Sequence, residues 1–217
     1  MKSTIWFDFT NVPHVNFLLP FIKILKDNYD VIYSLRDFAE TEGLFKKKVN
    51  EPFILAGIHS GGRKFSKVLG MIGRAYLLNK RLPEFDLKIS VGGDASNYVS
   101  WWRGKKSITF DDNETAPNWR YSYFTDFAFW PDAVDKSKLI KQGFKEERLY
   151  QYNGFKEDIY LADYKPDSTF LQMLPFKEYV VVRPENTQAN YVSTNESSIV
   201  PGLLKKLNSE NINVLYL

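Results

Sequence analysis

The chain of 217 residues contains no cysteine, which excludes disulfide bonds and thiolate metal sites. It has no apolar run long enough to cross a bilayer and no signal-peptide pattern, so we expect a cytoplasmic protein without a transmembrane segment. The formal net charge of only +3 gives no indication of nucleic-acid binding. A Gly-x-Gly-x-x-Gly loop is missing after the first predicted strand, which argues against an ordinary dinucleotide site.

The sequence is rich in aromatic residues, at 16%, and alternates apolar strand-like runs with helical patterns. We expect most of these rings to fill the core, and stacking of one or two of them on a sugar or a base is the alternative. The alternation predicts an α/β fold with a parallel sheet and helices on both faces. Pro20 is expected near the first turn of its helix. Strands are predicted at 4–9, 30–34, 53–55, 87–91, 107–110 and 126–130, and helices at 15–26, 38–49, 64–81, 94–102 and 136–142.

A turn-rich segment at 165–168 predicts a boundary between two domains, 1–163 and 164–217. Beyond this boundary, strands at 179–182 and 213–217 flank a helix at 198–208. A single βαβ unit lacks the neighbouring strands and the cover that a parallel sheet needs. We therefore expect residues 164–217 to be the start of an incomplete, truncated second domain.

Three polar residues follow or end the first predicted strand, where doubly wound sheets place their ligands. The imidazole of His14 could act as a base or as a hydrogen-bond donor, or it could cap or pack at the helix start. Asp8 could be catalytic, or it could pair with neighbouring backbone N–H groups. Asn11 suits a turn or a helix cap and could also contact a ligand hydroxyl.

Two later loops carry further candidates. Gly92 and Gly93 permit positive φ and a close backbone approach, and Asp94 is expected to be the N-cap of the next helix or a carboxylate facing the cleft. The run from Asp111 to Glu114, with Asp112 and Asn113 between them, could be a solvated loop. It could also hold Mg²⁺ with a diphosphate, or contain one carboxyl of raised pKa for general-base work.

In the second domain, Arg183 leads a loop with Glu185 that follows the predicted strand at 179–182. Its guanidinium suits a diphosphate, or alternatively a salt bridge. A polar loop at 59–63, which begins with His59, could contact a substrate.

Four loop motifs, at 13–20, 91–96, 153–154 and 183–186, resemble in order and spacing those of the GT-B class. They are similar in particular to the non-hydrolysing UDP-N-acetylglucosamine 2-epimerases. A closer resemblance, over nearly the whole chain, is to an uncharacterised, mostly archaeal GT-B-like family of unknown function. That resemblance is carried by the segments 6–15, 36–37, 110–114, 153–157 and 181–184.

The chain departs from the epimerases at several positions. His14 stands where they have an acidic residue, Phe17 replaces a basic one, and their histidine near Val182 is missing. Because epimerisation needs groups that remove and return a proton, these losses count against it. The resemblance then implies a nucleotide-sugar-dependent glycosyltransferase of cell-surface or envelope glycan synthesis. An epimerase-like enzyme and a non-catalytic binding module remain alternatives.

The resemblance also implies a role for each of the two predicted domains. It implies an acceptor- or sugar-binding first domain and a nucleotide-binding second domain. It implies a UDP-linked sugar as donor substrate, a glycan or lipid-linked acceptor, and neither a cofactor nor a metal. A homo-oligomer is left open. The expected catalytic residues are His14, Asp8 and Glu114, and the expected binding residues are Asn11, Gly92, Gly93, Asp94, Asp112, Asn113, Arg183 and Glu185.

Overall fold

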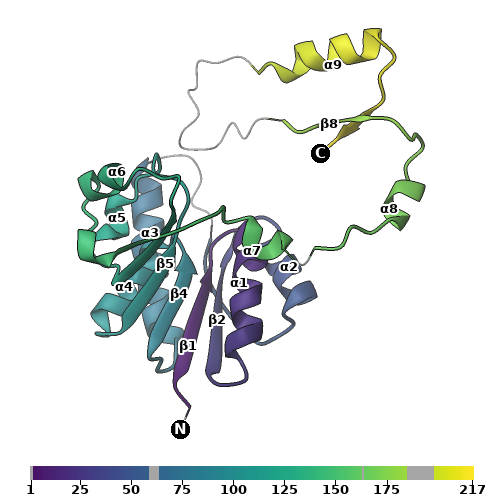
Figure 1. Ribbon diagram of the computed structural model, residues 1–217. Helices are drawn as coiled ribbons and strands as arrows, with labels where there is room; N and C mark the ends of the chain where they lie inside the picture. Colours follow the sequence, from purple (N-terminus) through teal and green to yellow (C-terminus); the bar gives the residue numbers. More distant parts are fainter. Residues whose placement is uncertain (1, 59–63, 163, 185–197) are drawn as a thin grey trace. The chain divides into compact units, whose positions relative to one another are not determined.

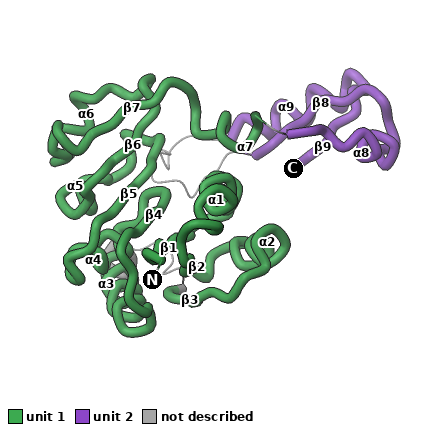
Figure 2. The backbone as a smooth tube through the Cα atoms, turned by 60° about the horizontal axis from the view of Figure 1, so that its bottom comes forward, with its two compact units in different colours: residues 1–163 green, residues 164–217 purple. Residues whose placement is uncertain are grey.

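The computed structural model describes residues 2–58, 64–162, 164–184 and 198–217. The chain forms two compact units, Met1–Asp163 and Tyr164–Leu217, which are coloured separately in Figure 2. No helix among the described residues is long and apolar enough to cross a membrane.

Unit 1 is built on a seven-stranded parallel sheet with the order β3-β2-β1-β4-β5-β6-β7. The chain adds strands outward from β1 to β3 and then returns to add β4 to β7 on the other side. The order therefore reverses between β1 and β4, which is where doubly wound sheets form their ligand crevice. The strands are β1 Thr4–Phe9, β2 Asp30–Asp37, β3 Ile54–Ile58, β4 Leu87–Val91, β5 Lys106–Phe110, β6 Phe127–Pro131 and β7 Leu149–Tyr152.

Helices cover both faces of this sheet (Figure 1). α1 and α2 pack on one face, and α3 and α4 pack on the other. Strand β1 shows why, because its residues are apolar on both sides: Phe7 and Phe9 face α1 and α2, whereas Trp6 packs toward α3 and α4. The helices are α1 Val12–Leu25, α2 Thr41–Lys48, α3 Lys64–Arg81, α4 Asp94–Trp102, α5 Trp119–Ser122, α6 Lys136–Lys141, the 3-10 turn η1 Glu146–Arg148 and α7 Asp158–Leu161.

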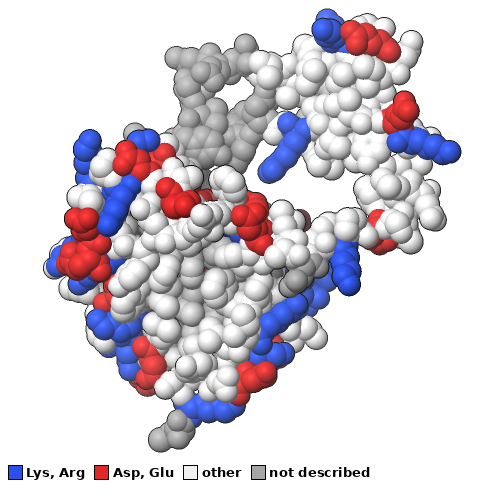
Figure 3. All heavy atoms as spheres, viewed as in Figure 1, with Lys and Arg blue, Asp and Glu red and all other residues white. Residues whose placement is uncertain are grey.

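The face of β4, β5 and β6 beside α1 carries an apolar groove of about 450 Å³. Ile108, Phe110 and Phe129 line it from the sheet, and Phe21 and Leu25 line it from α1. Figure 3 shows a broad area without charged side chains on the side of unit 1 that Figure 1 presents.

Helix α1 begins at Val12, three residues earlier than predicted. The Asn11 side chain accepts a hydrogen bond from Val12 N (2.9 Å) and caps the helix, and Pro13 occupies the first turn, where a missing N–H costs nothing. The expectation that Pro20 lies near the first turn is therefore wrong. Pro20 stands in the helix interior and cannot donate to the carbonyl of Asn16.

The predicted strands at 4–9 and 87–91 and the helix at 64–81 are confirmed, as is the α/β class with a parallel sheet. The edge strand β7 and the short helices α5 and α7 were not predicted. β7 has the sequence Leu-Tyr-Gln-Tyr, which lacks the continuous apolar run of a central strand because one side of an edge strand is unpaired.

Unit 2 is small. Its strands β8 Val180–Val182 and β9 Val214–Tyr216 pair in parallel, and its helices are α8 Thr169–Gln172 and α9 Val200–Ser209. Val182, Val200 and Leu207 form its core.

Candidate functional site

The ends of β1, β4 and β5 meet at the carboxyl edge of the sheet in unit 1. Gly92 and Gly93 follow β4 with φ of +56° and +101°, values that glycine adopts readily. A Cβ on Gly93 would lie 2.7 Å from Ser96 Oγ and 3.7 Å from Asp8 Oδ2. A Cβ on Gly92 would lie 3.3 Å from Asp111 Oδ2. Three predicted loops therefore converge, and the double glycine lets the backbone fit between two carboxylates.

Asp8 is fully buried and binds Arg74 of α3 through two hydrogen bonds, Nη1 to Oδ2 at 3.0 Å and Nη2 to Oδ1 at 2.6 Å. Ser34 Oγ also donates to Oδ1 at 2.6 Å. Burial opposes ionisation, but the charge and hydrogen bonds of Arg74 outweigh it and hold the pKa of Asp8 below its usual value. This geometry favours Asp8 as the anchor of the site floor more than as a general base.

His14 lies in the first turn of α1, with Nδ1 3.4 Å from Thr10 N and 3.1 Å from Thr10 Oγ1. Because a backbone N–H can only donate, Nδ1 accepts and the proton resides on Nε2. Burial, followed by the positive charge of Lys156, lowers the pKa of His14 to about 4. His14 is thus a neutral ring at pH 7, suited to donating a hydrogen bond and weak as a base.

Asp94 is the first residue of α4, and the N-cap position belongs to Gly93, so the expected N-cap role of Asp94 is wrong. The reason is that Gly93 in its left-handed conformation already offers its carbonyl to Asn97 N (3.1 Å). Burial raises the pKa of the Asp94 carboxyl to about 6. The positive charge of Arg120 opposes this rise, and the Asp111 carboxylate adds to it. Arg120 Nη1 lies 3.8 Å from Asp94 Oδ2, and a quarter of the Asp94 side chain is exposed. This carboxyl can reach a ligand and exchange a proton near neutral pH.

The loop after β5 is held by its own polar groups rather than solvated. Tyr121 Oη donates to Asp111 Oδ2 at 2.5 Å, and the backbone N of Asp112 donates to Asp111 Oδ1 at 2.8 Å. Burial raises the pKa of Asp111. Asp112 forms an ion pair with Lys156 at 2.6 Å. Among the described residues, no group of three or more acidic or histidine side chains is arranged to hold a metal ion.

The last two residues of this loop have structural partners. Asn113 Oδ1 accepts from Thr115 N (2.9 Å) and Thr115 Oγ1 (2.6 Å), which closes a local turn. Glu114 forms an ion pair with Lys138 of α6 at 3.2 Å, and its backbone carbonyl accepts from Gln142 Nε2. Glu114 is therefore turned toward α6.

No sequence pattern indicated Arg74, Arg120 or Tyr121, because each side chain belongs to a helix and its partner lies elsewhere in the chain. The sequence indicated Lys156 only weakly as a site residue, since it lies just after the Asn153-Gly154 motif.

The remaining predicted residues lie away from this cluster in the chain. Arg183 follows β8 in unit 2 and is exposed. Glu185 and the loop at 59–63 with His59 lie outside the described residues. Binding by these residues stays a prediction.

Several solved structures share this fold. S. aureus MnaA with UDP matches with a TM-score of 0.70 and 14% identity, over 99% of this chain and 62% of that one. The UDP-N-acetylglucosamine 2-epimerase from Rickettsia bellii matches with a TM-score of 0.70 and 13% identity, over 100% of this chain and 62% of that one. A UDP-glucosyltransferase from Polygonum tinctorium matches with a TM-score of 0.58 and 9% identity, over 100% of this chain and 65% of that one. The chain thus has a GT-B-like α/β fold and spans less than two thirds of the length of these proteins.

No curated protein matches the chain at a significant level. A family model does match, over residues 3–217, and it is described as a protein of unknown function (DUF354). This confirms the resemblance noted in the sequence, and the chain belongs to the DUF354 family.

Proposed function

We propose that this protein acts in a nucleotide-sugar-dependent glycosyltransferase reaction, with the carboxyl edge of unit 1 as the acceptor side. The observation that carries the proposal is Asp94, a partly exposed carboxyl whose pKa of about 6 suits a general base near neutral pH. It follows the left-handed Gly92-Gly93 turn at the point where the strand order reverses.

In this reaction an acceptor hydroxyl attacks the anomeric carbon of the donor sugar. A bond forms between the hydroxyl oxygen and that carbon, the bond to the diphosphate breaks, and Asp94 takes the hydroxyl proton. His14 donates from Nε2 to a substrate oxygen, since its Nδ1 is turned to Thr10. Asp8 and Arg74 hold the floor under Gly93. The departing diphosphate leaves with the electron pair of the broken bond.

The proposal assigns the donor nucleotide, UDP-linked, to unit 2 through Arg183 and Glu185. A forked guanidinium after a strand is suited to a diphosphate. The acceptor is a glycan or a lipid-linked sugar of a cell-surface or envelope polymer, and the reaction uses no cofactor and no metal. Support comes from the shared fold, of which one example holds UDP.

A sugar-nucleotide epimerase is the second candidate, and one observation favours it. Asp94 and Asp111 both have a raised pKa, and the Asp111 carboxylate contributes to the rise at Asp94. Two such carboxyls could remove and return a proton at one sugar carbon. Against this, Asp111 is engaged by Tyr121 Oη, which leaves it less free to move a proton.

The test is incubation of the protein with UDP-N-acetylglucosamine, with and without a sugar acceptor. Calorimetry measures binding, and NMR of the products identifies the reaction. Release of UDP with a new glycosidic bond supports the transferase, whereas intact nucleotide with an inverted sugar carbon supports the epimerase. Binding without conversion, or no binding, overturns both enzymes. Asp94→Asn is the site variant in this test. Asp30→Asn, at the exposed amino end of β2, is its control.

A further inference from the structure

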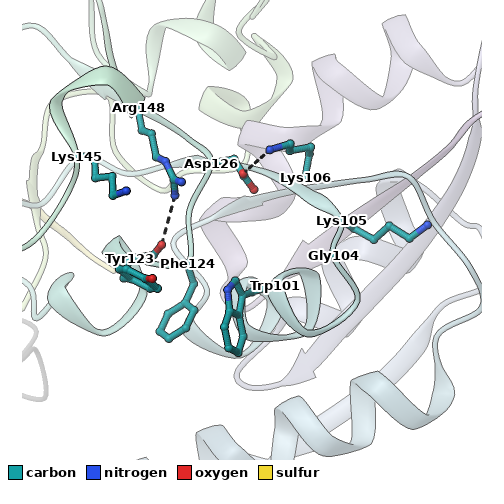
Figure 4. A pocket seen from close by; sticks show the side chains of 9 residues that line it. All are labelled: Trp101, Gly104, Lys105, Lys106, Tyr123, Phe124, Asp126, Lys145 and Arg148. Atoms are coloured by element: carbon teal, nitrogen blue, oxygen red, sulfur yellow. Dashed lines mark hydrogen bonds and ion pairs between the residues drawn. The ribbon is translucent and has the colours of Figure 1, made fainter.

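A pocket lies at the amino edge of the same sheet, opposite the carboxyl edge that carries Asp94. It has a volume of about 220 Å³ (Figure 4). The segments that line it lead into three neighbouring strands: Lys105 leads into β5, Phe124 precedes β6 and Arg148 leads into β7. Since the amino ends of parallel strands meet at one edge, these loops form a common wall.

The pocket is rich in positive charge. Lys105, Lys106, Lys145 and Arg148 line it, against a single lining carboxylate, Asp126. Asp126 is already engaged by Lys106 at 2.9 Å, as Figure 4 shows. Lys106 is therefore neutralised locally, and the charge that remains belongs to the other three side chains.

Of those three, Arg148 and Lys145 have no carboxylate partner among the residues that the structure describes. Arg148 Nη1 donates to the backbone carbonyls of Thr125 at 3.0 Å and Tyr123 at 3.4 Å, which fixes the guanidinium without neutralising it. In Figure 4 the nitrogen ends of Lys145 and Arg148 point toward the same part of the pocket. Two cations directed to one point repel each other unless an anion lies between them. Lys105 is only loosely paired, at 3.5 Å from the exposed Glu84.

Exposed aromatic rings adjoin these cations. Trp101 and Tyr123 are 53% and 61% exposed, and both touch the ring of Phe124, at 5.2 and 5.4 Å between centroids. Tyrosine and tryptophan are the side chains most used where one end of a contact is apolar and the other is wet. The cations and the rings together suit a ligand with an anionic group attached to an apolar or ring-bearing part.

We propose that this pocket binds the phosphate group of such a ligand, with Lys145 and Arg148 around the phosphate and Trp101 and Tyr123 against its apolar part; Lys105 extends away from this point toward Glu84. The forked guanidinium of Arg148 and the mobile ammonium groups of lysine are the usual protein donors to phosphate oxygens. The phosphate comes either from the head group of a phospholipid or from a soluble phosphate ester. This site is separate from the carboxyl edge, and it stands independently of the reaction proposed there.

The experiment has two arms on the same protein. One measures flotation with vesicles of phosphatidylcholine, with and without phosphatidylglycerol. The other measures binding of inorganic phosphate, glycerol phosphate and phenyl phosphate by calorimetry. The charge variant is Lys145→Gln/Arg148→Gln, which removes the two converging cations. Its matched control is Lys23→Gln/Lys47→Gln, which removes two exposed lysines of α1 and α2 and gives the same net charge.

We expect binding in at least one arm, and the arm that responds identifies the source of the phosphate. The charge variant weakens that binding about tenfold or more, because charge-assisted hydrogen bonds to the phosphate are lost, and the control does not. Trp101→Ala weakens binding of phenyl phosphate or of vesicles and leaves inorganic phosphate unchanged. No binding in either arm, or equal loss in the variant and its control, overturns the proposal. Circular dichroism of each variant checks that it is folded.

Discussion

The two edges of the sheet in unit 1 differ in charge, burial and internal bonding. At the carboxyl edge, Asp8 and Asp111 are engaged by Arg74 and Tyr121, and the backbone packs closely on them. At the amino edge, Lys145 and Trp101 project into solvent. The side chains of the carboxyl edge are held in place by their partners, whereas those of the amino edge are exposed.

The difference fits the two roles proposed for these edges. A carboxylate changes its pKa only when burial and neighbours act on it, so an acid–base site needs a fixed, partly dry surrounding. A phosphate is bound by charge at a surface, and long exposed side chains suffice for that. The structure therefore predicts that substitutions at the carboxyl edge affect both stability and catalysis, whereas those at the amino edge affect binding alone.

The largest expected effect is that of Asp94→Asn on the proposed transfer reaction. Removing a general base is expected to lower kcat by roughly two to four orders of magnitude. Since the pKa of Asp94 is about 6 and the base works ionised, wild-type activity should rise with pH through 6. That limb should disappear in the variant. A pH–rate profile of both proteins measures this, and a variant with an unchanged profile would assign the base elsewhere.

Arg74→Met is expected to destabilise unit 1 by about 3–5 kcal/mol, because it leaves the buried Asp8 carboxylate unpaired. Urea unfolding measures the loss. The double variant Asp8→Asn/Arg74→Met should recover part of it, since the isolated charge is gone. If the double variant is no more stable than Arg74→Met, the ion pair is not what fixes the floor of the site.

The carboxyl edge could be located from the sequence, but the pairing of its side chains could not. The strand at 4–9 is a buried apolar run and Asn11-Val12-Pro13 marks a helix start, so His14 and Asn11 could be placed at a strand end. The partner of Asp8 lies 66 residues away on an amphipathic helix, where nothing local distinguishes Arg74 from a surface arginine.

A third expectation concerns Lys88, which lies on β4 between the two edges and is fully buried. Its Nζ donates to Asn97 Oδ1 at 2.9 Å and Thr109 Oγ1 at 3.0 Å. Burial lowers the pKa of Lys88 from 10.5 to about 7. Between these values the unfolded chain binds more protons than the folded one, so stability rises with pH, by at most about 1.4 kcal/mol per pH unit.

Urea unfolding between pH 7 and pH 9 tests this. Wild-type stability should increase over that interval, and Lys88→Met should remove most of the increase because the titrating amine is gone. Lys23→Met, at an exposed position of α1, is the control and should retain the wild-type dependence. A wild-type protein without any increase would mean that Lys88 titrates normally.

Of the two substitutions expected to affect the reaction, His14→Ala has the smaller effect, about ten- to a hundredfold in kcat, the size of a lost hydrogen bond to a developing charge. Because the pKa of His14 is about 4, the limb near pH 6 should remain in this variant. Kinetics of His14→Ala beside Asp94→Asn separate the two roles. Loss of the limb in His14→Ala would return the role of base to the histidine, as the sequence alone suggested.

The role of Asp94 shows where prediction from sequence stops. Its position after two glycines indicated a strand-to-helix turn, yet whether Gly93 or Asp94 caps the helix depends on backbone angles that the sequence leaves open. Its raised pKa depends on burial and on Asp111, which follows a different strand. In the same way, the cations of the amino edge are separate surface residues in the sequence and become one pocket only when three strands align.

In the proposed reaction, the donor sugar must reach the acceptor hydroxyl at the carboxyl edge of unit 1, where Asp94 takes the proton. The most direct measurement is an NMR titration of the isotope-labelled protein with UDP-N-acetylglucosamine. Shifts are expected at the backbone amides of Gly92, Gly93 and Asp94, whether or not the diphosphate also shifts the amides of Gly104 and Lys145 at the amino edge. Shifts confined to the amino edge, or no shift at Gly93 at saturating ligand, would contradict this role of the carboxyl edge.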